Sequence, residues 1–369
     1  MIKIALIGMR GLVGSVLMQR MLEEQDFQYF EPHFFSTSQV GKATELKNFE
    51  QHIYEDANNI ELLKQYPIIL SCQGGSFTEK IYPELRKIWR GYFIDAASTL
   101  RMKDDAMIIF DPLNGKALEA GIKQGIKTFV GSNCTVSLLL FALDGLLKAD
   151  AIEWLSVMTY QAASGAGAEA MKELLSQMHE MTAPLDLNSP GTSILSIERQ
   201  ATQIQNSGSL LTHATLKPLA GNILPWIDSD LGNGMSREEA KMQPEAHKIL
   251  QKNNIMMDSL CVRVGALRCH SQGVTMKLKR SMTVDEITKI LGDANPWVKV
   301  ISNNKEASLH DLTPAAIAGS LNVAIGRLRK LNLPGETWSA FTVGDQLLWG
   351  AAEPLRRFLR ILLTQMDKT

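Results

Sequence analysis

IKIALIGMRGLVGSVLMQRMLEE, residues 2–24, opens the chain with a short apolar strand, a glycine-containing turn and an amphipathic helix. Gly8, Gly11 and Gly14 follow the strand, and the apolar residues after them recur at helical spacing. A strand, a turn of small residues and a helix N-terminus together can hold the pyrophosphate of a dinucleotide. The spacing differs by one residue from G-x-G-x-x-G, so a tight turn without a ligand remains the alternative.

The pattern of short apolar strands continues after this opening. Runs at residues 33–35, 67–72, 92–95 and 107–110 have strand character and alternate with helical segments. Such alternation predicts a parallel sheet covered on both faces. We therefore expect an α/β protein with an N-terminal Rossmann-type dinucleotide-binding domain over residues 1–133.

The pattern changes after residue 133. Residues 154–160 resemble a strand, residues 166–181 a helix, and residues 260–267 and 273–279 a pair of long strands. This predicts an α+β catalytic and dimerisation domain over residues 134–350, with a large mixed, mostly antiparallel sheet. Residues 351–369 carry apolar side chains at helical spacing and are expected to pack back on the first domain.

Composition argues against several classes of protein. The chain has 369 residues, with 38 basic and 39 acidic side chains and a net charge of −1. This balance gives no attraction to nucleic acid or to an anionic membrane, and no apolar run is long enough to span one. The four cysteines show no metal-binding or disulfide spacing, so we expect no metal site and a reducing cytoplasm.

Residues 131–137, GSNCTVS, precede the apolar run 138–141 and predict the start of a helix. Ser132 or Asn133 can cap this helix, which places Cys134 in its first turn. The macrodipole favours negative charge there, so the thiol should ionise more easily and act as a nucleophile. The alternative is a small buried apolar residue.

Other candidates each have a structural alternative. His270 lies beside a polar turn at a strand end and could be a general base, although structural histidines are commoner. Arg263 precedes it by seven residues, an odd offset that points to the opposite face unless a bulge intervenes. Arg101 follows the end of a strand of the first domain, and ligands of doubly wound sheets bind at such strand ends. A surface salt bridge is the alternative role for both Arg101 and Arg263.

Two further motifs leave alternatives open. Ser236 and Glu239 form a capping box, so Glu238 and Lys241 could belong only to a solvated helix face. In the first domain, the second strand ends in residues 36–38, Ser-Thr-Ser, where an NAD site usually has an acid. Hydroxyls together with Arg10 suit a 2′-phosphate and favour NADP, unless the serines only form a turn.

Several blocks carry a resemblance to a known family. These are GMRGLVGSVLMQRM, FFSTSQVG, SCQGGSFT, DAASTLRMKDDA, FVGSNCTVSLLL, TYQAASGAGA, CVRVGALRCHSQ and FTVGDQLLWGAAEPLRR. In this order they resemble the aspartate-β-semialdehyde dehydrogenases of Gram-negative bacteria nearly from end to end. The resemblance implies a homodimeric enzyme that reduces L-aspartyl-4-phosphate with NADPH through a cysteine thioester. That reaction serves lysine, diaminopimelate, threonine and methionine biosynthesis.

The resemblance also implies a role for individual residues. Cys134 would be the nucleophile, His270 the acid/base catalyst and Gln161 the residue that orients the substrate. Arg263 would bind the substrate carboxylate, Glu238 its amino group, and Arg101 and Lys241 the phosphate, with Asn133 nearby. The implied cofactor contacts are Gly8, Arg10, Gly11, Leu12, Val13, Gly14, Thr37, Ser38, Gln73, Ser164, Gly165, Pro190 and Gln346.

Two other functions compete with this one. A related acyl-phosphate reductase, such as N-acetylglutamyl-phosphate reductase, would share the fold and the thioester chemistry. A non-catalytic nucleotide-binding relative should have lost the cysteine or the histidine, and this chain keeps both.

Overall fold

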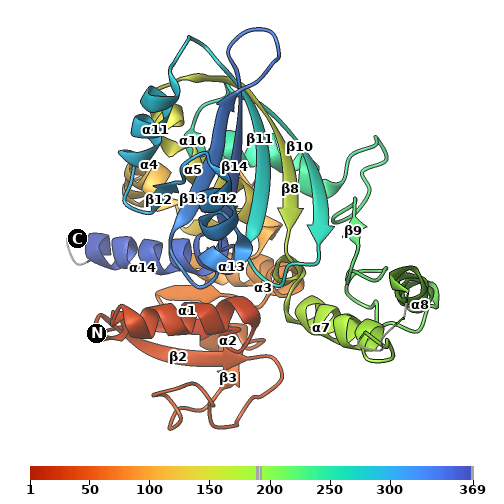
Figure 1. The fold of residues 1–369 in the computed structure, drawn as a ribbon. Helices are drawn as coiled ribbons and strands as arrows, with labels where there is room; N and C mark the ends of the chain where they lie inside the picture. The colour runs from red at the N-terminus through yellow and green to blue at the C-terminus, as the bar shows by residue number, and fades with distance from the viewer. Residues whose placement is uncertain (188–190, 192, 367–369) are drawn as a thin grey trace.

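The computed structural model describes residues 1–187, 191 and 193–366. They form two sheets joined by buried helices, with the N-terminal sheet at the bottom of Figure 1 and the second sheet above it. The Pro190 cofactor contact and the last three residues of the expected C-terminal helix lie outside the described residues.

The first sheet has seven strands, all parallel, in the order β3-β2-β1-β4-β5-β7-β6. The strand order reverses between β1 and β4, which is where doubly wound sheets bind ligands. The strands are β1 (Ile2–Ile7), β2 (Phe30–Ser36), β3 (Glu55–Asp56), β4 (Ile68–Ser71), β5 (Tyr92–Asp95), β6 (Ala106–Ile109) and β7 (Thr128–Gly131).

Helices cover both faces of this sheet, which confirms the Rossmann-type expectation. One face packs on α1 (Leu12–Glu23), α4 (Asp111–Lys123) and α14 (Glu353–Met366), and the other on α2 (Ile60–Leu63) and α3 (Gly75–Ile88). Leu355, Phe358 and Leu359 of α14 are buried against the first sheet. The C-terminal helix therefore packs back on the N-terminal half, as predicted.

The second sheet is mixed, in the order β12-β13-β14-β11-β8-β10-β9. Two strand pairs are parallel and the other four antiparallel, as the sequence predicts. Its strands are β8 (Ile152–Gln161), β9 (Ile223–Leu224), β10 (Met256–Val264), β11 (His270–Leu278), β12 (Val298–Val300), β13 (Val323–Lys330) and β14 (Thr337–Gly344).

One expectation about this sheet is wrong. The segments near residues 260–267 and 273–279 form β10 and β11, but these strands do not pair with each other. β8 lies between them, parallel to β10 and antiparallel to β11. Two successive long strands suggest a hairpin, but the strand that separates them comes a hundred residues earlier in the chain.

The inner face of the second sheet packs on a core built around α5 (Cys134–Ala142). Every residue of α5 after Cys134 is buried: all are apolar except Thr135 and Ser137, whose hydroxyls donate to Asn133. The other core helices are α6 (Asp144–Lys148), α10 (Met242–Leu250) and α11 (Val284–Gly292). This helix thus fixes Cys134 between the two sheets.

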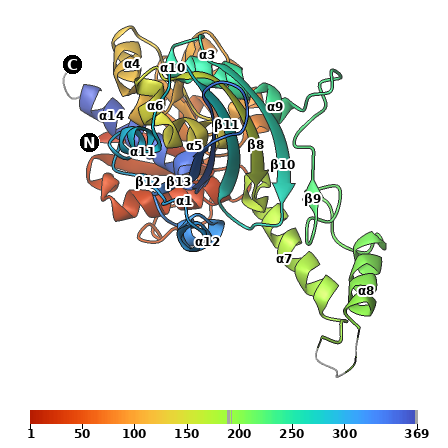
Figure 2. The same cartoon turned by 45° about the horizontal axis from the view of Figure 1, so that its top comes forward.

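The remaining helices lie at the edges. α7 (Ala168–Thr182) and α8 (Ile194–Asn206) project away from the body of the molecule (Figure 2). Shorter helices are α9 (Arg237–Ala240), α12 (Lys305–Asp311) and α13 (Pro314–Ile317), and a single π-helical turn, η4, covers Leu348–Ala352. No helix in the described part of the chain is long and apolar enough to cross a membrane.

Candidate active site

Cys134 is the first residue of α5 and lies in a cavity of about 430 Å³ between the two halves of the molecule. Asn133 caps the helix, since its Oδ1 accepts hydrogen bonds from the N–H groups of Thr135 and Val136. Of the two caps that the sequence allowed, the structure selects Asn133. Gly350 of η4 packs so closely on the cysteine that an added Cβ would lie 2.7 Å from the Cys134 Cβ.

His270 is fully buried behind the cavity, with Nε2 3.3 Å from the Cys134 Sγ. The Ala162 N–H donates to His270 Nδ1 at 3.1 Å. Because Nδ1 accepts this bond, the neutral ring carries its proton on Nε2. The histidine therefore presents an N–H donor to the sulfur.

His270, Gln161 and Arg263 lie side by side on the inner face of the second sheet. Gln161 on β8 is paired with Arg263 on β10, and Ser271↔Tyr160 on the other side of β8 places His270 opposite Gln161. The odd offset between Arg263 and His270 therefore does not separate them, because they belong to different strands with β8 between. The expectation that they face opposite ways is wrong.

Gly165 shows how tightly this group is packed. A Cβ on Gly165 would lie 2.8 Å from Arg263 Nη1 and 2.9 Å from His270 Cε1. Arg263 also donates from Nη1 to the Ala162 carbonyl at 2.9 Å. Only a residue without a side chain lets the chain cross here without displacing both groups.

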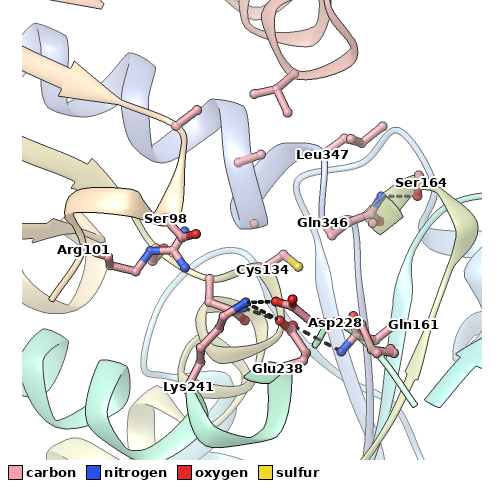
Figure 3. A pocket seen from close by; sticks show the side chains of 18 of the residues that line it. Ser98, Arg101, Cys134, Gln161, Ser164, Asp228, Glu238, Lys241, Gln346 and Leu347 are labelled. Atoms are coloured by element: carbon pink, nitrogen blue, oxygen red, sulfur yellow. Dashed lines mark hydrogen bonds and ion pairs between the residues drawn. The ribbon is translucent and has the colours of Figure 1, made fainter. Parts of the chain in front are cut away.

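Glu238 and Lys241 turn into the cavity rather than toward solvent. Glu238 is 8% exposed and accepts hydrogen bonds from Gln161 Nε2 and Lys241 Nζ at 3.4 and 3.1 Å (Figure 3). It also accepts one from Asn133 Nδ2 at 3.1 Å. Lys241 also pairs with Asp228 at 2.8 Å. A solvated helix face, the alternative that the sequence left open, is therefore wrong, while the capping box of Ser236 and Glu239 is confirmed.

Three cations line the cavity in the described part of the chain, and two of them are paired. Arg101 contacts Glu245 at 3.0 Å, and Lys241 contacts Glu238 and Asp228. Arg263 is 7% exposed and, in the part of the chain that the structure describes, has no carboxylate within ion-pair distance. It is thus the described cation best able to take an anionic group of a ligand.

The electrostatics of the pair differ from the expectation for a helix N-terminus. Burial raises the pKa of the Cys134 thiol to about 12; the Glu238 carboxylate adds to the rise, and Arg263 and Arg101 oppose it. Burial, followed by the Arg263 cation, lowers the pKa of His270 to about 3. Without a ligand the pair is a neutral thiol beside a neutral imidazole, because burial outweighs the helix dipole.

Burial opposes ionisation of Glu238 and Lys241 as well, but their contacts outweigh it. Lys241 and the hydrogen bonds from Asn133 and Gln161 lower the pKa of Glu238. Glu238 and Asp228 in turn raise the pKa of Lys241. Both groups are therefore charged at neutral pH.

A second hollow, of about 320 Å³, lies at the point where the first sheet reverses its strand order. Gly8 has φ +79° there, and a Cβ on it would lie 2.7 Å from the backbone of Cys72 and Gln73. A Cβ on Gly14 would lie 2.3 Å from the Gly8 carbonyl oxygen, so α1 packs directly on the turn. This backbone cradle fits a dinucleotide pyrophosphate.

The structure divides the expected cofactor contacts between the two hollows. Gly8, Arg10, Gly11, Thr37, Ser38 and Gln73 line the hollow of the first sheet, whereas Val13, Ser164, Gly165 and Gln346 line the cavity of Cys134. Leu12 and Gly14 line neither, since they form the first turn of α1 behind the glycine turn.

Gln346 has contacts that a cofactor role alone does not explain. Its Oε1 accepts from the Cys269 N–H at 2.9 Å, and its Nε2 donates to Ser164. Cys269 has φ +72°, a strained conformation for a residue with a side chain. Gln346 therefore stabilises the turn at Cys269, which positions the next residue, His270.

Several functional candidates escaped the sequence analysis. Glu245, Gly350 and Asp228 lie at the cavity of Cys134 or behind its cations, and Glu45 pairs with Arg10 beside the hollow of the first sheet. Glu245, Asp228 and Glu45 lie outside the motifs of the sequence, and Gly350 lies within FTVGDQLLWGAAEPLRR without any sign of its role, because each acts through a contact between distant segments. Among the described residues no group of three or more His, Cys, Asp or Glu is arranged for a metal ion.

A doubly wound nucleotide-binding sheet joined to a second α/β domain places the chain among the dinucleotide-dependent oxidoreductases. Residues 3–121 match the family model for the semialdehyde dehydrogenase NAD binding domain, and residues 143–349 match the semialdehyde dehydrogenase dimerisation domain. The structure is similar to that of an aspartate semialdehyde dehydrogenase from Francisella tularensis, with 46% identity, a TM-score of 0.94, and coverage of 98% of this chain and 100% of that one. The chain therefore belongs to the aspartate-semialdehyde dehydrogenase family, and its cofactor is a nicotinamide dinucleotide.

More distant structures share the fold. Aspartate semialdehyde dehydrogenase II from Vibrio cholerae, complexed with ASA, is 22% identical with a TM-score of 0.80, and 98% of each chain is covered. The enzyme with NADP from Candida albicans is 16% identical with a TM-score of 0.67, covering 99% of this chain and 98% of that one.

Proposed function

We propose that this protein catalyses the NADP-dependent reductive dephosphorylation of L-aspartyl-4-phosphate to L-aspartate-4-semialdehyde, and the reverse phosphorylating oxidation. The observation that carries the proposal is Cys134 on a helix N-terminus, 3.3 Å from His270, in a cavity lined by three cations. The substrate has a carboxylate and a phosphate, which require cations, and an acyl carbon, which requires a nucleophile.

Cys134 would act by covalent catalysis. Its sulfur attacks the acyl carbon of the substrate, the carbon–oxygen bond to phosphate breaks, and the thiol proton leaves with the phosphate. The result is a thioester on Cys134. When bound, a nicotinamide cofactor would supply the hydride that reduces such a thioester. Cleavage of the carbon–sulfur bond then releases the aldehyde and the thiolate, which takes up one proton.

His270 would act as a hydrogen-bond donor throughout. The Ala162 N–H occupies Nδ1, so the proton on Nε2 is directed at the sulfur and at any oxygen bonded to the attacked carbon. Between the thioester and the aldehyde lies a tetrahedral thiohemiacetal. Its oxygen carries negative charge, which a hydrogen-bond donor such as Nε2–H stabilises. For Nε2 to accept the thiol proton, the imidazole would have to carry its own proton on Nδ1. That proton would then face the Ala162 N–H, which points at Nδ1.

The other side chains would bind the ends of the substrate. Arg263 takes the carboxylate, since among the described cations of the cavity it has no paired acid, and Glu238 takes the amino group. Arg101 and Lys241 hold the phosphate. Two amides complete the set: Asn133 lies near the phosphate subsite, and Gln161 orients the substrate near the thiol.

We place the adenosine end of NADP in the hollow at Gly8 and the nicotinamide end at Val13, Ser164 and Gln346. Thr37, Ser38 and Arg10 are the groups suited to the 2′-phosphate. Gln73 donates to Thr37 at 3.2 Å and shapes this subsite.

A homodimer would form through the outer face of the second sheet. Met158, Tyr160, Met256 and Leu260 of β8 and β10 are 40%, 37%, 63% and 48% exposed and lie on adjacent strands. Such an apolar surface is typical of an interface. We propose domains of residues 1–133 with the C-terminal helix, and 134–350. The free thiol that the chemistry needs fits a reducing cytoplasm.

The test is a phosphate-dependent reduction of NADP with aspartate semialdehyde, measured for the protein and for Cys134→Ser. We expect turnover in the first and none in the second, with cofactor binding retained, because a hydroxyl ionises far less readily than a thiol. Turnover of N-acetylglutamate semialdehyde in preference to aspartate semialdehyde would assign the chain to the related reductase instead.

A further inference from the structure

Glu245 is a buried acid that the proposed chemistry does not use. It lies on α10, is 2% exposed, and reaches from the second half of the molecule to two groups of the first. Its carboxylate contacts Arg101 Nη1 at 3.0 and 3.2 Å and accepts a hydrogen bond from the Asn133 N–H at 3.2 Å. Both groups border the cavity of Cys134.

These contacts fix the direction of the Arg101 guanidinium. Arg101 Nε donates to the Gly131 carbonyl at 2.8 Å, and Nη1 is held by Glu245. Among the described residues these contacts occupy Nε and Nη1, so Nη2 is the nitrogen that can reach a ligand. Arg101 lies at the edge of the cavity, across from Gln161 and Gln346, with Cys134 between them (Figure 3).

We propose that Glu245 is a positioning residue of the phosphate subsite, which holds Arg101 and the Asn133 cap in the orientation that receives the anion. The inference rests on the proposed function, since it takes the ligand of Arg101 to be phosphate. A guanidinium binds phosphate through donors in a rigid plane, so its orientation decides how many of them reach the oxygens. Glu245 touches neither substrate nor cysteine and acts only through these two groups.

The proposal predicts an effect confined to phosphate. Glu245→Gln keeps the size of the side chain but removes its charge and turns a donor toward Arg101 or Asn133. We expect the KM for phosphate in the oxidative direction to rise by about tenfold or more, the effect of losing a charge-assisted contact. The burst of reduced cofactor formed without phosphate should change less than about threefold, because thioester formation precedes phosphate entry.

Two further variants protect the test against misfolding. Glu245→Asp keeps the charge and withdraws it by one methylene, so its phosphate KM should rise by about three- to tenfold with the same unchanged burst. Glu239→Gln is the matched control, a buried acid whose carboxylate accepts the N–H groups of Ser236 and Cys261 and pairs with no cation among the described residues. It should leave the phosphate KM unchanged even where it lowers the melting temperature.

Failure of the inference and failure of the proposed function give different results. If Arg101→Lys leaves the phosphate KM unchanged, Arg101 does not bind phosphate and the proposed subsite is wrong. If Arg101→Lys raises it but Glu245→Gln and Glu245→Asp change it less than about twofold, or lower it, the positioning role is refuted. The positioning role is also refuted if Glu245→Gln lowers the burst of reduced cofactor by the same factor as it raises the phosphate KM. An equal rise of the phosphate KM in Glu239→Gln would refute it as well.

Discussion

Gly165 offers the sharpest test of the site, because one methyl group there would strike two groups assigned to different tasks. A Cβ at this position would lie 2.8 Å from Arg263 Nη1, and 2.9 and 3.0 Å from His270 Cε1 and Nε2. Ordinary contacts of a Cβ begin at 3.4 Å, so both side chains must retreat by roughly half an ångström in Gly165→Ala. The backbone φ of Gly165 is not positive, so alanine adds no strain of its own.

The size of the effect follows from the chemistry. A misplacement of about 1 Å can cost about a hundredfold in rate, and here two groups each move about half as far. We expect kcat/KM for aspartate semialdehyde to fall by about ten- to a hundredfold, which corresponds to about 1.4–2.7 kcal/mol of transition-state stabilisation. Both kcat and KM should change, since His270 faces the reacting atoms and Arg263 is assigned to the substrate carboxylate.

Steady-state kinetics and thermal unfolding of Gly165→Ala, beside Gly115→Ala, decide the matter. A Cβ on Gly115 of α4 meets only the Asp111 Cβ, at 3.9 Å, so that variant should keep full activity. If Gly165→Ala retains more than about a third of the original kcat/KM, the packing argument is refuted. If it weakens NADP binding and leaves the substrate kinetics alone, Gly165 serves the cofactor, as the sequence resemblance implied.

Three further outcomes are expected. Arg263→Lys should lower kcat/KM for aspartate semialdehyde by about ten- to a hundredfold through loss of one charge-assisted bond, and should leave an aldehyde without the carboxylate nearly unaffected; an equal loss with both aldehydes would make Arg263 structural. Burial raises the pKa of Cys134 to about 12 and lowers that of His270 to about 3. The thiolate fraction therefore grows with pH, and the rate of alkylation by iodoacetamide without substrate should still rise above pH 9. A rate that is constant from neutral pH upward would instead indicate a thiolate–imidazolium pair. Arg10 pairs with Glu45 in the exposed loop beside the nucleotide hollow, so Glu45→Gln should lower the KM for NADP and leave that for NAD unchanged; equal efficiency of the original enzyme with both cofactors would remove the assignment of Arg10 to a 2′-phosphate.

The parts of the site that the sequence predicts well are those built by local interactions. The sequence predicts a turn of small residues at Gly8, and the structure shows there a positive φ and a close backbone approach that only glycine allows. The cap at Asn133 follows from the unpaired N–H groups of a helix start. Each of these conclusions needs only a few neighbouring residues, so a single sequence contains the information.

The parts that could not be predicted depend on segments that are distant in the chain. His270 and Arg263 looked as if they belonged to one hairpin, and the period of a strand then placed them on opposite faces. In the structure β8 lies between β10 and β11. Gln161 of β8 has Arg263 beside it on one neighbouring strand and His270 beside it on the other. Register between strands a hundred residues apart is decided by packing of the whole core, which local spacing does not reveal.

The ionisation of Cys134 shows why the same limit applies to chemistry. A helix N-terminus favours a thiolate, and this much is visible in residues 131–137. Its strength is small beside burial, and the neighbouring charges come from elsewhere: Glu238 opposes the thiolate while Arg263 and Arg101 favour it. These groups lie on α9, on β10 and in the loop after β5. The sequence around Cys134 therefore does not reveal their combined effect on the pKa of its thiol. The sequence thus points to Cys134 as the proposed nucleophile, but the protonation state of its thiol is a property of the assembled cavity and its charges.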